Sequence, residues 1–147
     1  VPMRKATFFT ASRDPKSLRV QDVMEHSEWT VETAMKASAV VHLLAERRIG
    51  SVPVVENGRT LVGLISEFDL LRVLDQGGDL GRVEAKDIMT TDVITTTEES
   101  LIGDVIHLLK EQHLIRVPVV RGRQLVGIVA RQDLLFGYVR ATAGYVP

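Results

Sequence analysis

Cysteine is absent from the 147-residue sequence, which excludes disulfide bonds, thiolate nucleophiles and cysteine-ligated metal sites. This absence is typical of a reducing compartment, so we expect a cytoplasmic protein. No apolar run approaches the ~20 residues that a membrane helix requires, and the N-terminal residues lack the apolar stretch of a signal peptide. We therefore expect no membrane partner.

Sequence motifs of catalysis are also lacking. The chain holds no P-loop, no glycine fingerprint of dinucleotide-binding proteins, no His-Glu-x-x-His and no nucleophile elbow. These absences indicate a protein that is not an enzyme.

The histidine spacing does not favour a metal site. His42 and His107 occupy equivalent positions in two predicted helices, which suggests a metal pair. However, they lie two residues from Val40 and Val105, so their side chains should point away from the apolar helix face. Because no further ligands can be identified, we expect exposed or interface histidines, no metal and no required cofactor.

Charge is balanced over the whole chain and uneven at its start. The net charge is −1, with 25% charged and 45% hydrophobic residues, as in an ordinary globular protein. Residues 1–19 form a basic arm, which is either solvated or docked on an acidic partner surface. Its charged residues are Arg4, Lys5, Arg13, Asp14, Lys16 and Arg19. Since the remainder has no basic excess, nucleic acid is a disfavoured partner.

Three segments occur twice in the same order, which identifies an internal repeat. The pairs are 22–24 with 87–89, 51–55 with 116–120, and 61–65 with 125–129. The shift is 65 residues for the first two pairs and 64 for the third. The residue that the second copy lacks falls in a predicted turn. Since turns tolerate deletions and strands do not, this position supports the predicted strands.

Each copy predicts the same run of elements. An extended segment (29–31 or 93–95) leads into a helix, then two strands (51–55 and 61–65 in the first copy) and a second helix (66–74 or 130–139). Asn57-Gly58 indicates a tight hairpin turn, and Thr96 with Glu99 has the form of a capping box. The inner faces of the first helices are predicted to carry Val40, Leu43, Leu44, Val105, Leu108, Leu109 and Gln112.

The predicted fold class is α/β (α+β), with two βαββα repeats packed in pseudo-twofold symmetry. One repeat has too little core to stand alone, so the two should pack together and leave equivalent clefts between them. We expect repeats at 20–80 and 81–140, with 75–81 as the linker and 141–147 as a C-terminal tail.

The junction between the last strand and the second helix carries the candidate chemistry. Ser66 and Asp69 allow two interpretations: a capping box, or a nucleotide site with a phosphate near the helix N-terminus and ribose hydroxyls on the carboxylate. In the second copy, Ala130 cannot cap through its side chain, yet Asp133 remains. The helix dipole favours an Asp there in either case, so both interpretations stay open.

Arg116 and Arg131 could supply positive charge to a phosphate, or could be solvated surface arginines. Their counterparts in the first copy are Ser51 and Glu67. We therefore expect one cleft to dominate phosphate binding.

The pattern resembles a tandem cystathionine-β-synthase (CBS) domain pair, also called a Bateman module, over about residues 20–140. The resemblance rests on Asp-Val/Ile-Met, Val-Pro-Val-Val and Gly-x-x-Ser/Ala-x-x-Asp-Leu-Leu, each present twice. It implies binding of AMP, ADP, ATP or S-adenosylmethionine in the cleft between the repeats. By the same resemblance Asp69 and Asp133 hold ribose, Ser66 lies near the phosphate, and Arg116 contacts phosphate.

The resemblance also places the strand before each proline in the adenine pocket. The residues so implicated are Gly50, Ser51, Val52, Ile115, Arg116 and Val117, and we add Thr95 and Arg131 as ligand contacts. Modules of this family usually dimerise through their helices, so we expect a homodimer. The leading hypothesis is a regulatory sensor that signals by conformational or oligomeric change. The alternative is a ligand-free dimerisation or interaction module acting on a regulated protein not identified here.

Overall fold

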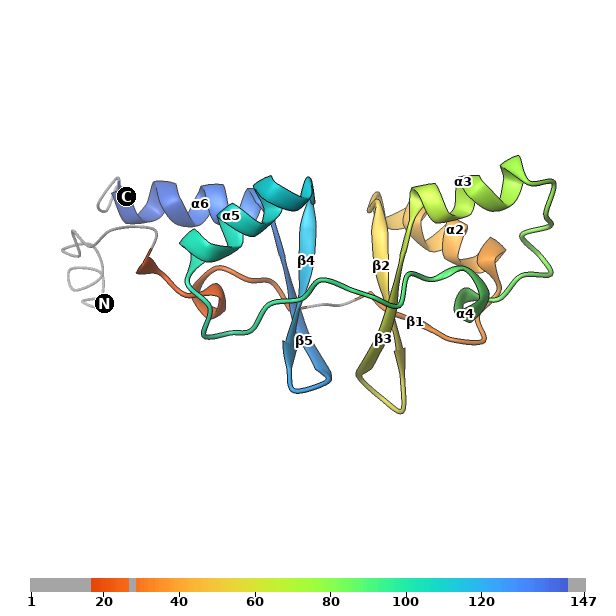
Figure 1. Ribbon diagram of the computed structural model, residues 1–147, viewed down its shortest axis with the longest axis horizontal. Helices are drawn as coiled ribbons and strands as arrows, with labels where there is room; N and C mark the ends of the chain where they lie inside the picture. Colours follow the sequence, from red (N-terminus) through yellow and green to blue (C-terminus); the bar gives the residue numbers. More distant parts are fainter. Residues whose placement is uncertain (1–16, 27–28, 143–147) are drawn as a thin grey trace. The chain divides into compact units, whose positions relative to one another are not determined.

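The computed structural model describes residues 17–26 and 29–142 (Figure 1). Strands and helices are interspersed along the described chain, so the expected mixed α+β class is confirmed. The elements are η2 (Val20–Asp22), β1 (Val31–Glu32), α2 (Ala37–Arg47), β2 (Ser51–Glu56), β3 (Thr60–Ser66), α3 (Glu67–Asp75), α4 (Ala85–Ile88), α5 (Ile102–Gln112), β4 (Arg116–Arg121), β5 (Gln124–Ala130) and α6 (Arg131–Thr142).

The described chain forms two compact units. Unit 1 comprises 17–26, 95–121 and 126–142, and unit 2 comprises 29–94 and 122–125. The opening segment of each repeat therefore packs on the strands of the other repeat. In unit 1, Glu25 pairs with Ile128 of β5, and in unit 2 Thr90 pairs with Leu64 of β3. The structural units thus differ from the linear repeats, because the repeats exchange these segments.

Unit 2 is built on β1, β2 and β3. β1 runs parallel to β2, and β2 is antiparallel to β3. Asn57 and Gly58 have φ of 48° and 91°, the left-handed conformations that a tight hairpin turn requires. This confirms the predicted hairpin. Helices α2 and α3 lie on one side of the strands (Figure 1) and close a core around Val40, Val54 and Ile65.

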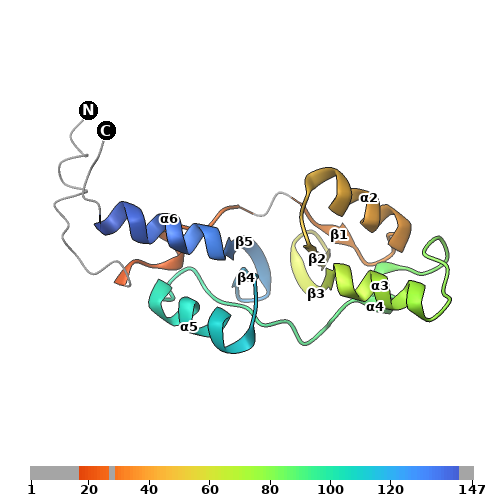
Figure 2. The same ribbon diagram turned by 90° about the horizontal axis from the view of Figure 1, so that it is seen from above.

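Unit 1 repeats this plan with β4, β5, α5 and α6. Figure 2 shows α5 and α6 side by side. The core includes Val105, Val117 and Val129, and Val20 of the opening segment is also fully buried. Because Val20 belongs to the first repeat, this core joins residues from both repeats.

The predicted capping box of Thr96 and Glu99 is wrong. Helix α5 begins at Ile102, after Leu101. Thr96 extends the sheet instead, since its N–H donates to Pro118 O at 3.0 Å and its carbonyl accepts from Val120 N at 2.9 Å. Its backbone groups are satisfied by β4, so it does not start the helix. Gln112, predicted on the inner helix face, is exposed at the end of α5.

Candidate functional site

The unit 2 junction, defined as Gly50–Val52 with Ser66–Asp69, is organised by one carboxylate. Asp69 is the third residue of α3 and is 7% exposed. Its Oδ2 accepts from Ser66 N at 2.8 Å and from Ser66 Oγ at 3.2 Å. This arrangement closes the first turn of α3, so the capping interpretation of this pair is confirmed.

The second oxygen of Asp69 is also occupied. Arg72, one turn further along α3, donates from Nη1 to Asp69 Oδ1 at 3.1 Å. The carboxylate therefore has three donors: a backbone N–H, a hydroxyl and a guanidinium.

The unit 1 junction is defined as Ile115–Val117 with Ala130–Asp133. It has the same backbone arrangement, but its carboxylate receives fewer hydrogen bonds. Ala130 N donates to Asp133 Oδ2 at 2.7 Å, which reproduces the backbone half of the cap. Ala130 has no hydroxyl, and Phe136 stands where α3 carries Arg72. Within residues 17–26 and 29–142, Asp133 Oδ1 has no hydrogen-bond or ion-pair partner.

In each junction one equivalent hydrogen bond joins the start of the helix to the residue that precedes β2 or β4. Glu67 N donates to Gly50 O at 3.1 Å, and Arg131 N donates to Ile115 O at 3.0 Å. The structure therefore brings the predicted residues together in two groups, one within each unit. In unit 2, Ser51 also pairs directly with Ser66 across β2 and β3.

The predicted pocket residues differ in exposure. Val52 and Val117 have no exposed surface, so their side chains serve the two hydrophobic cores. Thr95 and Arg116 are half-buried, whereas Arg131 is exposed and Ile115 is 56% exposed. Among the predicted residues of unit 1, the polar side chains with exposed surface are therefore those of Thr95, Arg116, Arg131 and Asp133.

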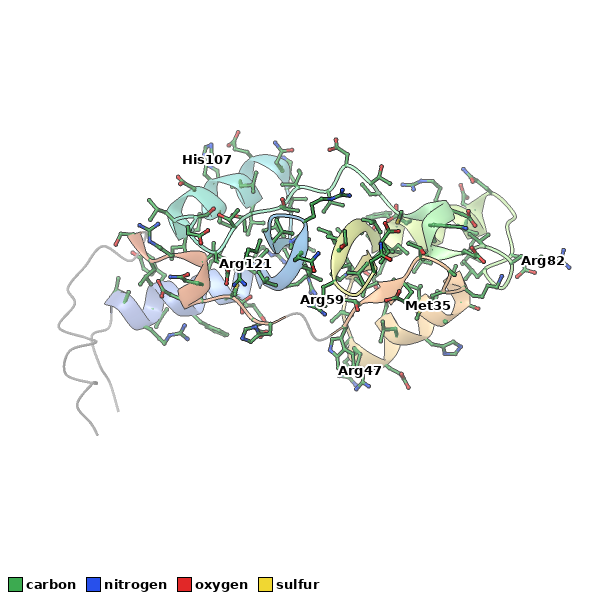
Figure 3. The ribbon with its side chains drawn as sticks, turned by 90° about the horizontal axis from the view of Figure 1, so that it is seen from below. Met35, Arg47, Arg59, Arg82, His107 and Arg121 are labelled. Carbon is green, nitrogen blue, oxygen red and sulfur yellow. The ribbon has the colours of Figure 1, made fainter. Side chains whose placement is uncertain are left out.

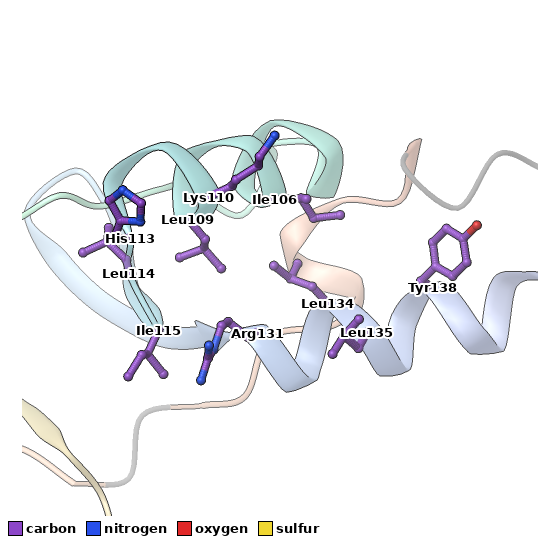
Figure 4. A pocket seen from close by; sticks show the side chains of 10 residues that line it. All are labelled: Ile106, Leu109, Lys110, His113, Leu114, Ile115, Arg131, Leu134, Leu135 and Tyr138. Atoms are coloured by element: carbon purple, nitrogen blue, oxygen red, sulfur yellow. The ribbon is translucent and has the colours of Figure 1, made fainter.

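Sequence reasoning missed an apolar groove on each unit. The groove of unit 1 lies between α5 and α6 and has a volume of about 610 Å³ (Figure 4). Its charged or basic lining residues are Lys110, His113 and Arg131. The groove of unit 2 lies between α2 and α3, has a volume of about 400 Å³ and carries Glu67.

The sequence did hold a signal for these grooves. Apolar residues occur on the outer faces of α3 and α6 as well as on their inner faces, and a helix that is apolar on both sides needs a second partner. The exposed examples are Phe68, Leu71, Leu74, Leu135, Phe136, Tyr138 and Val139.

His42 and His107 are exposed as expected, and Figure 3 shows His107 on the outer surface of α5. Among the residues that the structure describes, no group of three or more His, Asp or Glu is arranged to hold a metal ion. No helix in the same part of the chain has the length and apolar character to cross a membrane.

Comparison with known proteins gives two matches to the CBS domain family, at residues 20–76 and 85–140. An uncharacterized protein of Methanopyrus kandleri is 32% identical over 122 residues, which is 82% of this chain and 62% of that protein. The chain thus spans under two thirds of that relative's length.

Two solved structures share the fold. CBSX2 in complex with AMP has a TM-score of 0.75 and 25% identity, covering 84% of this chain and 97% of that one. The CBS domain pair of protein MJ0100, in complex with methylthioadenosine and S-adenosyl-L-methionine, has a TM-score of 0.70 and 27% identity, covering 80% and 97%.

Proposed function

Because the chain belongs to the CBS domain family, whose domain pairs are regulatory modules, we propose that it is a sensor of an adenosyl ligand. One observation carries the proposal: each unit holds a carboxylate at the third position of a helix, pinned beside the end of a strand. In unit 1 one oxygen of that carboxylate has no partner among the described residues, and the same junction contains Arg116 and Arg131.

Each group has a chemical role in this proposal. Asp69 and Asp133 accept hydrogen bonds from the two ribose hydroxyls, since an ionised carboxylate is an acceptor only. Helix N–H groups and the Ser66 hydroxyl face the phosphate in unit 2. In unit 1, Arg116 and Arg131 take that part by charge. The candidate ligands are AMP, ADP, ATP and S-adenosylmethionine, of which AMP and S-adenosyl-L-methionine are bound by the similar structures named above.

The proposed output is a change of conformation or of assembly, without catalysis and in the cytoplasm. A ligand can shift such an equilibrium only if it binds the two states with different affinity.

The proposed assembly is a homodimer through the two grooves. Leu135 is 64% exposed and Leu71 is 55% exposed, and each lines the apolar groove of its unit. Contiguous exposed apolar patches of this kind mark protein interaction sites. Covering them with a second copy removes this apolar surface from water.

Titration calorimetry and thermal unfolding with AMP, ADP, ATP and S-adenosylmethionine test the proposal. We expect at least one ligand to release or take up heat and to raise the midpoint of thermal unfolding. Adenine and ribose 5-phosphate, offered separately, are the matched controls and should bind far more weakly. No heat and no stabilisation with any of the four would overturn the sensor and favour the alternative, a ligand-free interaction module.

A further inference from the structure

In each carboxylate one oxygen, Oδ2, accepts a hydrogen bond from the backbone N–H three residues earlier. Oδ2 of Asp69 accepts from Ser66 N at 2.8 Å, and Oδ2 of Asp133 accepts from Ala130 N at 2.7 Å. Oδ2 of Asp69 also accepts from the Ser66 hydroxyl, so ribose depends on Oδ1 there, whereas Asp133 keeps one lone pair on Oδ2 as well as the whole of Oδ1.

The Oδ1 atoms differ because of a single position in the helix. Three residues after Asp69 the chain places Arg72, whose guanidinium lies 3.1 Å from Oδ1. Three residues after Asp133 it places Phe136, which has no donor. In the described part of the chain, Asp133 Oδ1 is left without a protein partner. The side chain of Asp69 is 8% exposed, whereas Asp133 is only half-buried.

We propose that Arg72 makes the two sites unequal: Asp133 receives the ribose of the first ligand molecule, and Asp69 receives a second one only after Arg72 has left Oδ1. This inference rests on the proposed function and adds the order in which the sites fill. Arg72 acts as a positioning residue that competes with ribose for one carboxylate.

The competition is limited in size. The Arg72 side chain is 60% exposed, so water screens the ion pair and the guanidinium can rotate away. An exposed pair of this kind changes an affinity by about two- to fivefold. The second site is therefore weakened and still usable, which spreads the response over a wider range of ligand concentration.

Calorimetric titration with AMP tests the order of binding. Asp133→Asn should remove the tighter binding, and Asp69→Asn the weaker. Asn keeps an oxygen that can accept the cap hydrogen bond. Arg72→Gln should tighten the weaker site by about two- to fivefold and leave the tighter site unchanged. Arg72→Lys, which keeps the charge, should stay close to the original chain.

The reciprocal substitution gives a matched control. Phe136→Arg places a guanidinium three residues after Asp133 and should weaken the tighter site by a similar factor, while Phe136→Gln should not. A weaker site that is unchanged or weakened in Arg72→Gln would overturn the inference. Loss of the weaker binding in Asp133→Asn would do the same. Either of these two results leaves the proposed sensor function intact. Absence of AMP binding in every variant, with no response to the other three ligands, would overturn both the order of binding and the proposed function.

Discussion

Met89 occupies the space that a Cβ atom on Gly63 would need. The opening segment of the second repeat is thereby seated on β3, next to the bridge between Thr90 and Leu64. In unit 1 the equivalent glycine is Gly127, where a Cβ would lie 2.7 Å from the backbone oxygen of Glu25. Both glycines of the repeated motif are therefore needed for close packing of the exchanged segments.

Gly127→Ala should destabilise the protein more than Gly63→Ala. The obstacle in unit 1 is a backbone oxygen that is held by Ile128 N at 2.8 Å and cannot move alone. The obstacle in unit 2 is mainly the Sδ and Cγ atoms of a methionine, which can move to other rotamers, while its Cβ stays at 3.0 Å. We expect a loss of about 2–3 kcal/mol against about 1 kcal/mol, measured by urea unfolding. Equal losses would show that the backbone of Glu25 yields as easily as Met89.

Ser66→Ala should cost about 0.5–1 kcal/mol of unfolding free energy. The substitution removes the hydroxyl that donates to Asp69 Oδ2 at 3.2 Å and leaves the backbone bond at 2.8 Å in place. Unit 1 already has this state, with Ala130 and Asp133. The matched variant Ala130→Ser should therefore stabilise by a similar amount. Chemical denaturation of both variants checks the pair. A Ser66→Ala chain that loses no stability, or an Ala130→Ser chain that gains none, would contradict the capping argument.

Replacing both Arg116 and Arg131 by Gln should weaken the binding of AMP by about three- to tenfold, because the phosphate then lacks two charged hydrogen-bond donors. Adenosine, which has no phosphate, should be unaffected. Arg123→Gln is the control, since Arg123 is an exposed arginine in the turn between β4 and β5. Competition titration of AMP against adenosine measures the difference. An equal loss for both ligands would show that the arginines support the fold and not the phosphate.

Leu135→Asp should dissociate the proposed homodimer. The side chain lines the α5–α6 groove and is 64% exposed in one copy, so a carboxylate there would be buried without a partner on association. Sedimentation velocity should show a monomer. Leu101→Asp, outside both grooves and 37% exposed, should leave the dimer intact. A dimer that persists in Leu135→Asp would place the interface elsewhere.

The predictions that held from sequence depend on short-range chemistry. Asn57-Gly58 dictates its own turn, and Asp69 meets Ser66 only three residues away. The prediction for Thr96 failed because its partner, Pro118, is distant in the chain and outweighs the local capping pattern. The exchange of opening segments could not be predicted from the sequence either, because it also depends on pairing between residues that are distant in the chain.

The candidate site was partly predictable. Its residue types and the contrast between Arg116 and Ser51 follow from aligning the repeats. The contrast between Arg72 and Phe136 was equally visible in the sequence. Its meaning required the structure, because a helical arginine at i+3 can point to solvent or bind the preceding carboxylate.

The exchanged opening segments have a mechanical consequence. Segments 20–26 and 126–140 both belong to unit 1, although they come from different repeats. Force applied through either segment would therefore act on the same unit, the one that carries Asp133. Unit 2 comprises the internal segments 29–94 and 122–125 of the described chain. A reporter attached to either of these two segments would thus register events at the Asp133 carboxylate more directly than events at Asp69.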